Sequence, residues 1–448
     1  MEQHEKQGVS TKAVLSLVLT FALLATAGTA LAERSYEVWA IDQSNSPVLS
    51  YGGTLYIYDG KALERRRRAA DAVPERIDLA AAAAALCFAK TQANPVRPHM
   101  VSMNTSQTHA IISFVTSGHV LIMDAKTRAP IECIRTSIGA GGARQVHFAM
   151  PSPNETYIAV ANQNGKLFER IDTNYATNTF ILNTAAMINL ATCLTPNNLF
   201  CEQAGVRPDN APIFPAIEAT SQYVFVTLRG GGLFVIDAQK TPMQIVAEYD
   251  VNTVHSNGFG GAQAGQKMFI DSGGGTRSHL FGADIYTFPV TGFSPLNPPN
   301  TPAPKVVLSD TSVDADAHGM TLTKHQRFLW VANRGHNFLW VIDTATDKVV
   351  NTIGLAGSVS TDPTPDLLVT SPKGSHVFMA LRGPNPLSAD PHASTGSTPG
   401  VGVIKVTQGG RNGRFEAIAR VSNLDATNVE RADVHSIAVR VTQDDDDD

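Results

Sequence analysis

The strongest constraint on the fold is a repeated unit of short apolar segments separated by turns. In its clearest copy, from His318 to Ile353, HGMTLT is followed by RFLWVANRG, NFLWVIDTATD and KVVNTI. Short runs rich in Val, Ile, Phe and Thr, bounded by Gly, Asn and Asp, are typical of β-strands. Because one such unit cannot bury its own apolar face, several copies must pack against one another.

The copies and the two chain ends together predict a closed ring. Units begin at residues 99, 147, 213, 255, 318 and 366, and a shorter piece begins at residue 435. Only one strand, SIAVRV, follows residue 435, whereas three segments near the start (YEVWAID, GTLYIYD and that around ERIDL) look like strands. One C-terminal strand joined to these three completes a seventh sheet and removes exposed sheet edges. The sequence therefore predicts an all-β, seven-bladed β-propeller over residues 33–443.

The chain ends carry targeting and charge signals. Residues 1–32 combine Lys6 and Lys12, an apolar run and an Ala30-Leu31-Ala32 ending, which predicts a cleaved signal peptide and a periplasmic or secreted protein. Only an uncleaved signal segment would contact a membrane. Residues 444–448 are an acidic tail, and the formal net charge of −5 does not favour nucleic-acid binding.

Four cysteines are compatible with disulfides in an exported protein. Cys193 and Cys201 flank a Pro/Asn-rich insertion and suit a local bridge, while Cys87 and Cys133 suit a bridge between neighbouring repeats. The sequence alone leaves the connectivity open. No C-x-x-C-H motif is present, which excludes covalently attached c-type haem.

Histidine recurs at one position of the repeat, at the start of the expected inner strand. In the two best-defined copies the histidine lies 15 residues before an asparagine that ends the second strand (162 minus 147 and 333 minus 318). In a ring these side chains surround the axis, and neutral imidazoles suit transition metals, with copper the leading expectation. The predicted metal ligands are His99, His147, His255, His318 and His435.

A second set of polar residues is expected on the same face. Arg229, Arg334 and Arg382 each follow the second strand in an Arg-Gly pair, and Asp366 takes the histidine position of its repeat. Guanidinium groups bind carboxylates and phosphates, so the three arginines are predicted to bind a substrate or a small anion. Asp366 is predicted to belong to the same substrate or anion site. The alternative is that the arginines tie neighbouring blades together.

The repeat resembles a known family. FLWVANRG followed by FLWVIDTATDKVVNTI is similar to the YVTN-type propeller repeat, whose wider superfamily includes the haem d1 propeller and the propeller domain of nitrous oxide reductase. In that reductase, histidines from successive blades hold a copper cluster. This chain departs from the pattern at Ile213 and Asp366 and lacks the reductase's additional copper-binding domain, so reduction of nitrous oxide is not expected.

Three function classes follow from these patterns. The first is an exported propeller that binds a transition metal or redox cofactor at the multi-histidine axial site, and acts as an oxidoreductase if an open coordination position and an electron partner exist. The second is a non-catalytic propeller that binds a protein, a peptide or a small organic ligand on the same face. The third, hydrolysis of a lactone with one Ca or Zn ion, suits Asp366 alone among the axial residues.

Overall fold

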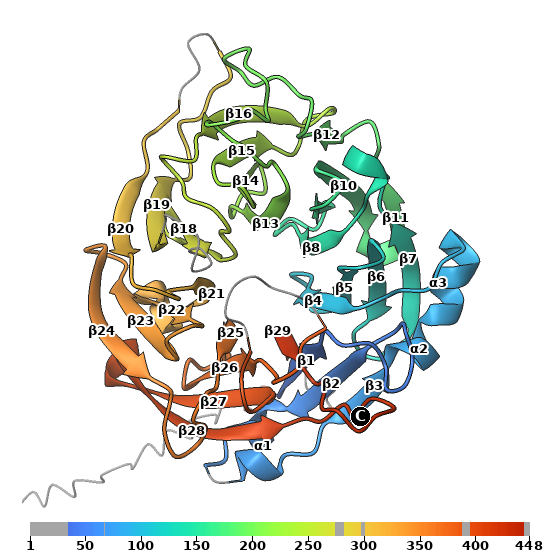
Figure 1. Ribbon diagram of the computed structural model, residues 1–448, viewed down its shortest axis with the longest axis vertical. Helices are drawn as coiled ribbons and strands as arrows, with labels where there is room; N and C mark the ends of the chain where they lie inside the picture. The colour runs from blue at the N-terminus through green and yellow to red at the C-terminus, as the bar shows by residue number, and fades with distance from the viewer. Residues whose placement is uncertain (1–34, 67, 274–281, 297–300, 388–394, 443–448) are drawn as a thin grey trace, which may run out of the picture. The chain divides into compact units, whose positions relative to one another are not determined.

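Seven antiparallel sheets surround one axis in the computed structural model (Figure 1). The structure describes residues 35–66, 68–273, 282–296, 301–387 and 395–442, so the predicted signal peptide and acidic tail lie outside the described residues. Within these ranges six sheets have four strands, and the sheet of blade 2 has a fifth. The predicted seven-bladed β-propeller is confirmed.

The strands follow one another from the axis outward in every blade except the seventh. Blade 1 contains β4 (Pro98–Met103), β5 (His109–Phe114), β6 (His119–Asp124) and β7 (Pro130–Arg135). Blade 2 contains β8 (Val146–Pro151), β9 (Tyr157–Asn162), β10 (Leu167–Asn174), β11 (Thr179–Leu182) and β12 (Ile188–Asn189). Blade 3 contains β13 (Pro212–Ile217), β14 (Tyr223–Leu228), β15 (Leu233–Asp237) and β16 (Gln244–Tyr249). Blade 4 contains β17 (Gly261–Ala264), β18 (Lys267–Gly273), β19 (Ala283–Pro289) and β20 (Lys305–Asp310).

The remaining blades complete the ring. Blade 5 contains β21 (Ala317–Leu322), β22 (Phe328–Asn333), β23 (Phe338–Asp343) and β24 (Lys348–Gly354). Blade 6 contains β25 (Pro365–Thr370), β26 (His376–Leu381), β27 (Gly400–Thr407) and β28 (Asn412–Arg420). Blade 7 contains β29 (Val434–Val441), β1 (Tyr36–Asp42), β2 (Thr54–Asp59) and β3 (Glu75–Asp78).

Blade 7 joins the two ends of the chain. The sheet order is β29-β1-β2-β3, and β29 pairs with β1 in antiparallel register, with Trp39 opposite Ala438. In Figure 1 the red strand β29 lies beside the blue strands β1 and β2. The predicted closure by one C-terminal strand is confirmed.

Apolar clusters between neighbouring blades hold the ring together. One cluster joins blades 5 and 6 through Trp330, Val377 and Ile404, all fully buried. The Trp330 indole also donates a hydrogen bond to the Gly410 carbonyl oxygen at 2.8 Å. Burial of a large aromatic side chain removes much apolar surface from water, so each interface of this kind stabilises the ring by several kcal/mol, about 2–3 per large side chain. Among the described residues, none of the helices has the length and apolar character needed to cross a bilayer.

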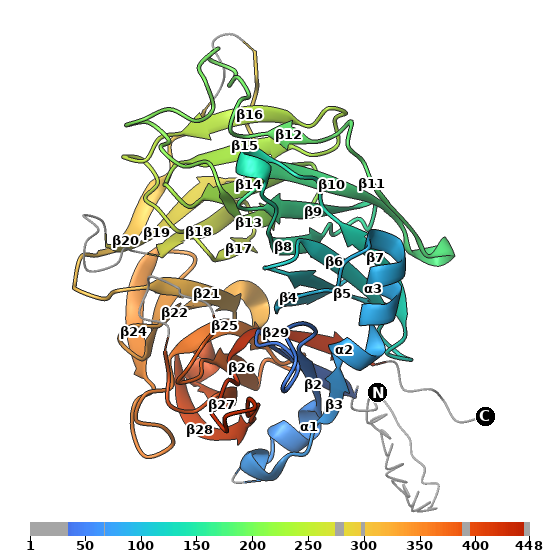
Figure 2. The ribbon, with the colours of Figure 1, turned by 45° about the vertical axis from the view of Figure 1, so that its right-hand side comes forward.

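Short helices lie in the connections between strands. The α-helices are α1 (Gly60–Leu63), α2 (Leu79–Ala82) and α3 (Ala84–Thr91). The 3-10 helices are η1 (Ala69–Asp71), η2 (Ala140–Gly142), η3 (Tyr175–Thr177), η4 (Lys324–Gln326) and η5 (Gln408–Gly410). In Figure 2, α3 lies beside β7, the outer strand of blade 1.

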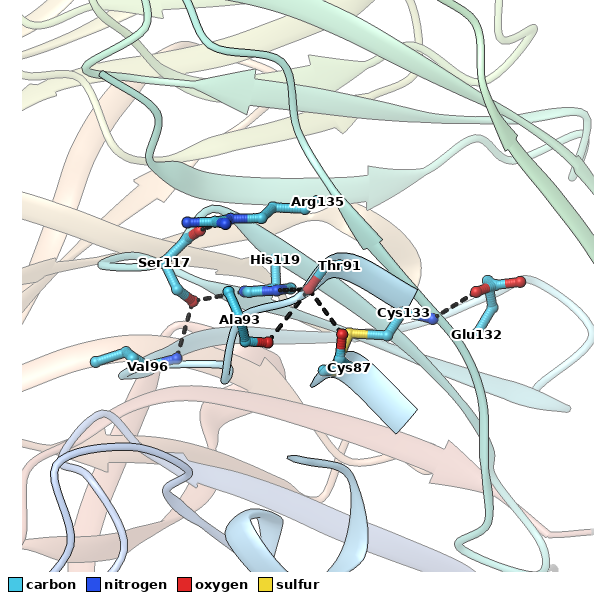
Figure 3. The surroundings of a disulfide bond; sticks show 9 residues. All are labelled: Cys87, Thr91, Ala93, Val96, Ser117, His119, Glu132, Cys133 and Arg135. Atoms are coloured by element: carbon cyan, nitrogen blue, oxygen red, sulfur yellow. Dashed lines mark hydrogen bonds between the residues drawn. A yellow bond between two sulfur atoms is a disulfide. The ribbon is translucent and has the colours of Figure 1, made fainter. Parts of the chain in front are cut away.

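Two disulfides are formed among the four cysteines, in the pairs that the sequence suggested without fixing. Cys87 on α3 is bonded to Cys133 on β7, and Cys193 is bonded to Cys201 within the insertion of blade 3. Figure 3 shows the first bridge beside Thr91, whose hydroxyl bonds the Cys87 carbonyl oxygen at 2.7 Å and the His119 ring nitrogen Nε2 at 2.8 Å. This bridge fixes the segment between blades 7 and 1 on the outside of the ring.

Blade 4 corrects one sequence prediction. Its inner strand β17 begins at Gly261, six residues after His255 (261 minus 255), so the prediction that His255 starts an inner strand is wrong. The His255 ring nitrogen Nδ1 lies 2.5 Å from Asp284 Oδ2 on β19, and its backbone N–H donates to the Tyr286 hydroxyl at 3.1 Å. These bonds hold His255 in the loop between β16 and β17.

Candidate functional site

In every blade except blade 4, a bulge at the start of the inner strand aims one residue toward the axis. In six blades the axial residue is the second residue of its strand, and the pairing with the neighbouring strand shifts at that point. A bulge leaves the extra residue out of the strand ladder and redirects its side chain. The six residues placed in this way are His99, His147, Ile213, His318, Asp366 and His435.

All of these side chains except that of Asp366, which is fully buried, line a cavity of about 450 Å³ at the propeller axis. Four of the five predicted histidines lie in its wall, and His255 does not. The three predicted arginines also reach it, together with two arginines from the loops that precede β4 and β8. The charged and aromatic lining residues are Arg97, His99, Arg144, His147, Arg229, Phe259, Asp316, His318, Arg334, Arg382 and His435.

Phe259 takes the place in blade 4 that sequence reasoning gave to His255. Its ring stacks on that of His318, with centroids 4.0 Å apart and an angle of 4° between the planes, and it meets His147 edge to face at 4.9 Å. On the other side of the cluster the His99 and His435 rings stack at 3.9 Å. The rings therefore form one aromatic cluster that fixes the orientation of the imidazoles.

The same cluster keeps the imidazoles neutral. Burial lowers the pKa of His99 and of His435 well below 6.5, and the neighbouring arginines and histidines act in the same direction on His99. Burial also lowers the pKa of His318, while Asp366 opposes that shift. Neutral imidazoles keep a nitrogen lone pair that can bind a metal ion.

Three buried groups lie close enough to share one ion, namely His318 on β21, Asp366 on β25 and His435 on β29. Their ligand atoms are all within 4.8 Å of one another. His318 Nε2 is 2.9 Å from Asp366 Oδ1, and His435 Nε2 is 3.9 Å from the same oxygen. The His318 contact lacks hydrogen-bond geometry, so Nε2 and Oδ1 have no hydrogen-bond partner among the described residues. Two imidazole nitrogens and a carboxylate oxygen are a ligand set for a divalent transition metal.

Gly319 allows this approach of blades 5 and 6. A Cβ atom at this position would lie 2.4 Å from the Asp366 carbonyl oxygen and 2.5 Å from the Leu367 Cα atom. Any larger residue would therefore push β21 away from β25 and separate His318 from Asp366.

Two of the three predicted anion-binding arginines are already paired with carboxylates. Arg382 Nη1 lies 2.8 Å from Asp366 Oδ2, and its other nitrogens bind Asp433 at 2.6 and 2.9 Å. Arg334 Nε lies 2.7 Å from Asp316, and its Nη1 is 3.7 Å from Asp366. The Arg382–Asp433 pair joins blades 6 and 7 and the Arg334–Asp366 contact joins blades 5 and 6, which matches the alternative in which the arginines tie the blades together. The other two pairs lie within a single blade.

This charge network keeps Asp366 ionised. Burial by itself would raise the pKa of the carboxyl group, but the facing His435 and His318 rings and the two arginines outweigh it and hold the pKa well below 3.8. Because the imidazoles are neutral, the guanidinium groups of Arg382 and Arg334 are the charges that keep Asp366 ionised. The arginines occupy Oδ2, whereas Oδ1 faces His318 and His435. Asp366 is thus an anionic ligand with one oxygen turned toward the imidazoles.

Arg229 differs from the other two predicted arginines. It lies 2.5 Å from Asp209 and 2.9 Å from Asn164, and its side chain is 41% exposed. Both partners lie in loops on the cavity side of blades 2 and 3. Arg229 therefore belongs to the open rim of the cavity and not to the buried network.

Sequence reasoning missed Phe259 and the residue that holds it. The buried Asp271 carboxylate on β18 accepts hydrogen bonds from the backbone N–H groups of Phe259 and Gly260, each at 2.7 Å. Burial raises the pKa of Asp271 well above 3.8. A usable signal existed, because the axial residue lies 15 residues before the end of the second strand in blades 1, 2, 3, 5 and 6. Counting back 15 residues from Gly273, the end of the second strand of blade 4, reaches residue 258. That position is directly before Phe259 and three residues after His255.

Comparisons with known proteins support the fold. No family model and no curated protein sequence matches the chain. A putative 6-phosphogluconolactonase from Bacteroides fragilis has a similar structure, with a TM-score of 0.57 and 10% identity over 92% of this chain and 99% of that one. The periplasmic gluconolactonase of Pseudomonas aeruginosa gives 0.56 and 14% over 91% and 100%, and a protein from Lactobacillus plantarum gives 0.56 and 11% over 90% and 99%.

At these identities the likeness shows the fold alone. The chain is a seven-bladed β-propeller, which supports its resemblance to YVTN-type propellers. Its axial cavity is lined by imidazoles and guanidinium groups, and this combination, not the fold, carries what can be inferred about function.

Proposed function

We propose that the protein binds a divalent transition-metal ion at the propeller axis through His318, Asp366 and His435. The observation that carries the proposal is the group of buried ligand atoms without hydrogen-bond partners among the described residues: His318 Nε2 and Asp366 Oδ1, 2.9 Å apart. A buried polar atom without a partner costs free energy, and an ion between the two atoms would remove that cost.

The chemistry of the three groups supports the proposal. The imidazoles are neutral and the carboxylate is charged, so no proton has to leave before an ion binds. Arg382 holds the second oxygen of Asp366 and orients the first, as partners of metal ligands commonly do. Two of the three ligands, His318 and His435, line the cavity, so an ion held by the three groups would keep coordination positions for a ligand from the cavity. Copper was the expectation for an all-histidine ring, and a mixed nitrogen and oxygen set suits zinc or iron(II) as well.

Metal titration of ligand variants tests the proposal. Elemental analysis of the purified protein comes first, followed by calorimetric titration of the EDTA-treated protein with Zn(II), Cu(II) and, without oxygen, Fe(II). We expect one ion per chain, and His318→Ala or Asp366→Asn should lower the affinity by about 100-fold or more. His147→Ala is the matched control, since His147 lies in the same cavity but outside the group of three.

The outcomes separate the alternatives. An affinity that falls equally in His147→Ala and His318→Ala would place the ion elsewhere in the cavity. A wild-type protein that contains no metal and binds none of the three ions would overturn the proposal. Thermal unfolding of each variant, measured without metal, shows whether a lost affinity reflects a lost fold.

A further inference from the structure

Two arginines of the cavity wall have no carboxylate partner among the described residues. Arg97 precedes His99 by two residues and Arg144 precedes His147 by three, and both line the axial cavity. They come from blades 1 and 2, whereas the proposed metal ligands come from blades 5, 6 and 7. In the closed ring the two groups therefore lie on different sides of the same cavity.

The Arg97 guanidinium is buried with most of its donors unused. Its Nε and Nη2 atoms are inaccessible to solvent and have no hydrogen-bond partner among the described residues, and Nη1 makes one long contact of 3.4 Å with the Leu387 carbonyl oxygen. Buried N–H groups of a cation without acceptors are costly, so such an arrangement points to an acceptor that binds from the cavity.

The nearest carboxylate cannot supply that acceptor. Asp433 attracts Arg97 electrostatically, but its two oxygens already accept bonds from Arg382, from the Gly383 backbone N–H and from the Gln43 side chain. The Arg97 charge is therefore not neutralised by a direct contact in the described part of the chain.

Arg144 also lacks a carboxylate partner among the described residues, but its side chain is only partly buried. No hydrogen bond or ion pair joins its guanidinium to another residue in the described ranges, and the nearby Glu169 is already bonded to the Ser137 N–H at 3.0 Å and to Asn162 Nδ2 at 2.9 Å. Its alkyl chain lies over Gly118, where a Cβ atom would be only 2.8 Å from the Arg144 Cδ and Cγ atoms. Gly118 thus leaves room for the arginine at the cavity wall.

Neutral groups beside the two arginines also have buried polar atoms without a hydrogen-bond partner in the described ranges. Gln145 Oε1 and His99 Nε2 are buried and have no hydrogen-bond partner among the described residues. Gln145 Oε1 is a hydrogen-bond acceptor and cannot bind an anionic group. It can, however, accept a hydrogen bond from a hydroxyl group of a ligand whose anionic group binds the arginines. Guanidinium donors beside a neutral acceptor are the groups that would recognise an anion carrying a hydroxyl.

We infer that this side of the cavity binds a small organic anion, whose carboxylate or phosphate group is held between Arg97 and Arg144 and whose hydroxyl donates to Gln145. Planar guanidinium groups bind such heads through paired charge-assisted hydrogen bonds. A cavity of about 450 Å³ lies within the usual range for small-molecule sites. The inference shares the axial cavity with the proposed metal site but does not depend on the metal.

Anion titration of the metal-free protein tests the inference. The EDTA-treated protein is titrated calorimetrically with inorganic phosphate, succinate and malate, which differs from succinate by one hydroxyl group. We expect wild-type binding in the millimolar range or tighter and a loss of about tenfold or more in Arg97→Gln and in Arg144→Gln. Arg97→Lys should give an intermediate loss, because it keeps the charge and loses the planar donor set. The preference among the three probes identifies the head group.

Two further variants keep the test specific. Arg414→Gln removes the same charge from the exposed outer strand β28, where Arg414 pairs with Glu416, and should leave the affinity unchanged. Gln145→Leu should remove the preference for malate over succinate and spare the affinity for succinate. Circular dichroism and thermal unfolding check that each variant is folded.

The result that overturns the inference is a wild-type protein that binds none of the three anions, or anion binding that Arg97→Gln and Arg144→Gln leave intact. His318→Ala should retain anion binding in the absence of metal. If no metal binds and arginine-dependent anion binding is still found, the metal proposal fails and this one stands.

Discussion

Two sides of the same cavity use arginine in different ways. In blades 5 and 6, Arg334 and Arg382 are buried and bonded to carboxylates of neighbouring segments. In blades 1 and 2, Arg97 and Arg144 face the cavity without such a partner among the described residues. All four are arginines that line the same cavity, so the difference lies in their surroundings.

This difference separates structural charges from ligand-binding ones. A paired buried charge has already recovered part of its desolvation cost within the protein, and it has few donors left for a ligand. A buried guanidinium such as that of Arg97, which has no carboxylate partner among the described residues, carries that cost until an external acceptor binds. Arg144 is partly exposed and adds a second guanidinium to the same wall. The blade 5 to 7 side therefore acts as a fixed frame that orients Asp366, while the blade 1 and 2 side remains available for an anion.

The largest expected effect is on stability and tests the frame directly. Arg382→Ala leaves Asp366 and Asp433 buried without their main partner and should lower the free energy of unfolding by about 3–5 kcal/mol. Arg97→Ala removes no ion pair and should change it by less than about 1 kcal/mol. Urea unfolding of both variants measures the difference, and equal losses would show that the two sides do not differ as described.

The fold and most axial positions could be predicted from the sequence because both follow from its local periodicity. The 15-residue spacing from His147 to Asn162 recurs in the observed blades, and the strand count at the two chain ends predicted the closure. It failed at His255 because blade 4 is shorter at its inner strand and the Asp271 carboxylate, not a strand ladder, holds Phe259 at the axis. The sequence pattern therefore assigned His255, which lies in a nearby loop, to the series of axial histidines.

The pairing of the arginines was beyond sequence reasoning for a different reason. Arg229 and Arg382 occupy similar Arg-Gly pairs after a second strand, yet one is bonded to Asp209 in its own blade and the other to Asp433, 51 residues later. Charge partners that lie one blade away depend on how the ring closes. Local sequence therefore predicted which residues reach the cavity and not which of them remain open to a ligand.

The next prediction concerns the pH dependence of stability. It compares the buried imidazoles with the charge network formed by Asp366 and its arginines. The pKa of His99 lies well below 6.5 in the folded protein, whereas the unfolded chain has the ordinary value. Below pH 6.5 the unfolded state binds more protons, so stability falls as the pH falls. His99→Leu should reduce the loss between pH 7 and pH 5 by about 2 kcal/mol, measured by urea unfolding in EDTA.

The intact charge network should not respond in that range. The pKa of Asp366 is held well below 3.8, so its contribution is present above that value and is lost only as the pH falls further. In Arg382→Ala this guanidinium no longer opposes burial, so the pKa of Asp366 rises and the stability difference from wild type should shrink as the pH falls from 7 to 5. A difference that stays constant over that range would show that Arg382 does not control the pKa of Asp366.

The smallest effect concerns Arg229, which is intermediate between the two sides. It is paired with Asp209 like the arginines of the frame, but its side chain is 41% exposed, and exposed ion pairs contribute little. Arg229→Gln should lower the free energy of unfolding by less than about 1 kcal/mol. Because Asp209 neutralises its charge and Asp209 and Asn164 occupy its Nε and Nη1 donors, the substitution should also weaken succinate binding only a few-fold. Calorimetry and urea unfolding measure the two effects on the same sample. A loss of binding as large as that in Arg97→Gln would extend the anion site into blade 3, and a loss of stability as large as that in Arg382→Ala would assign Arg229 to the frame.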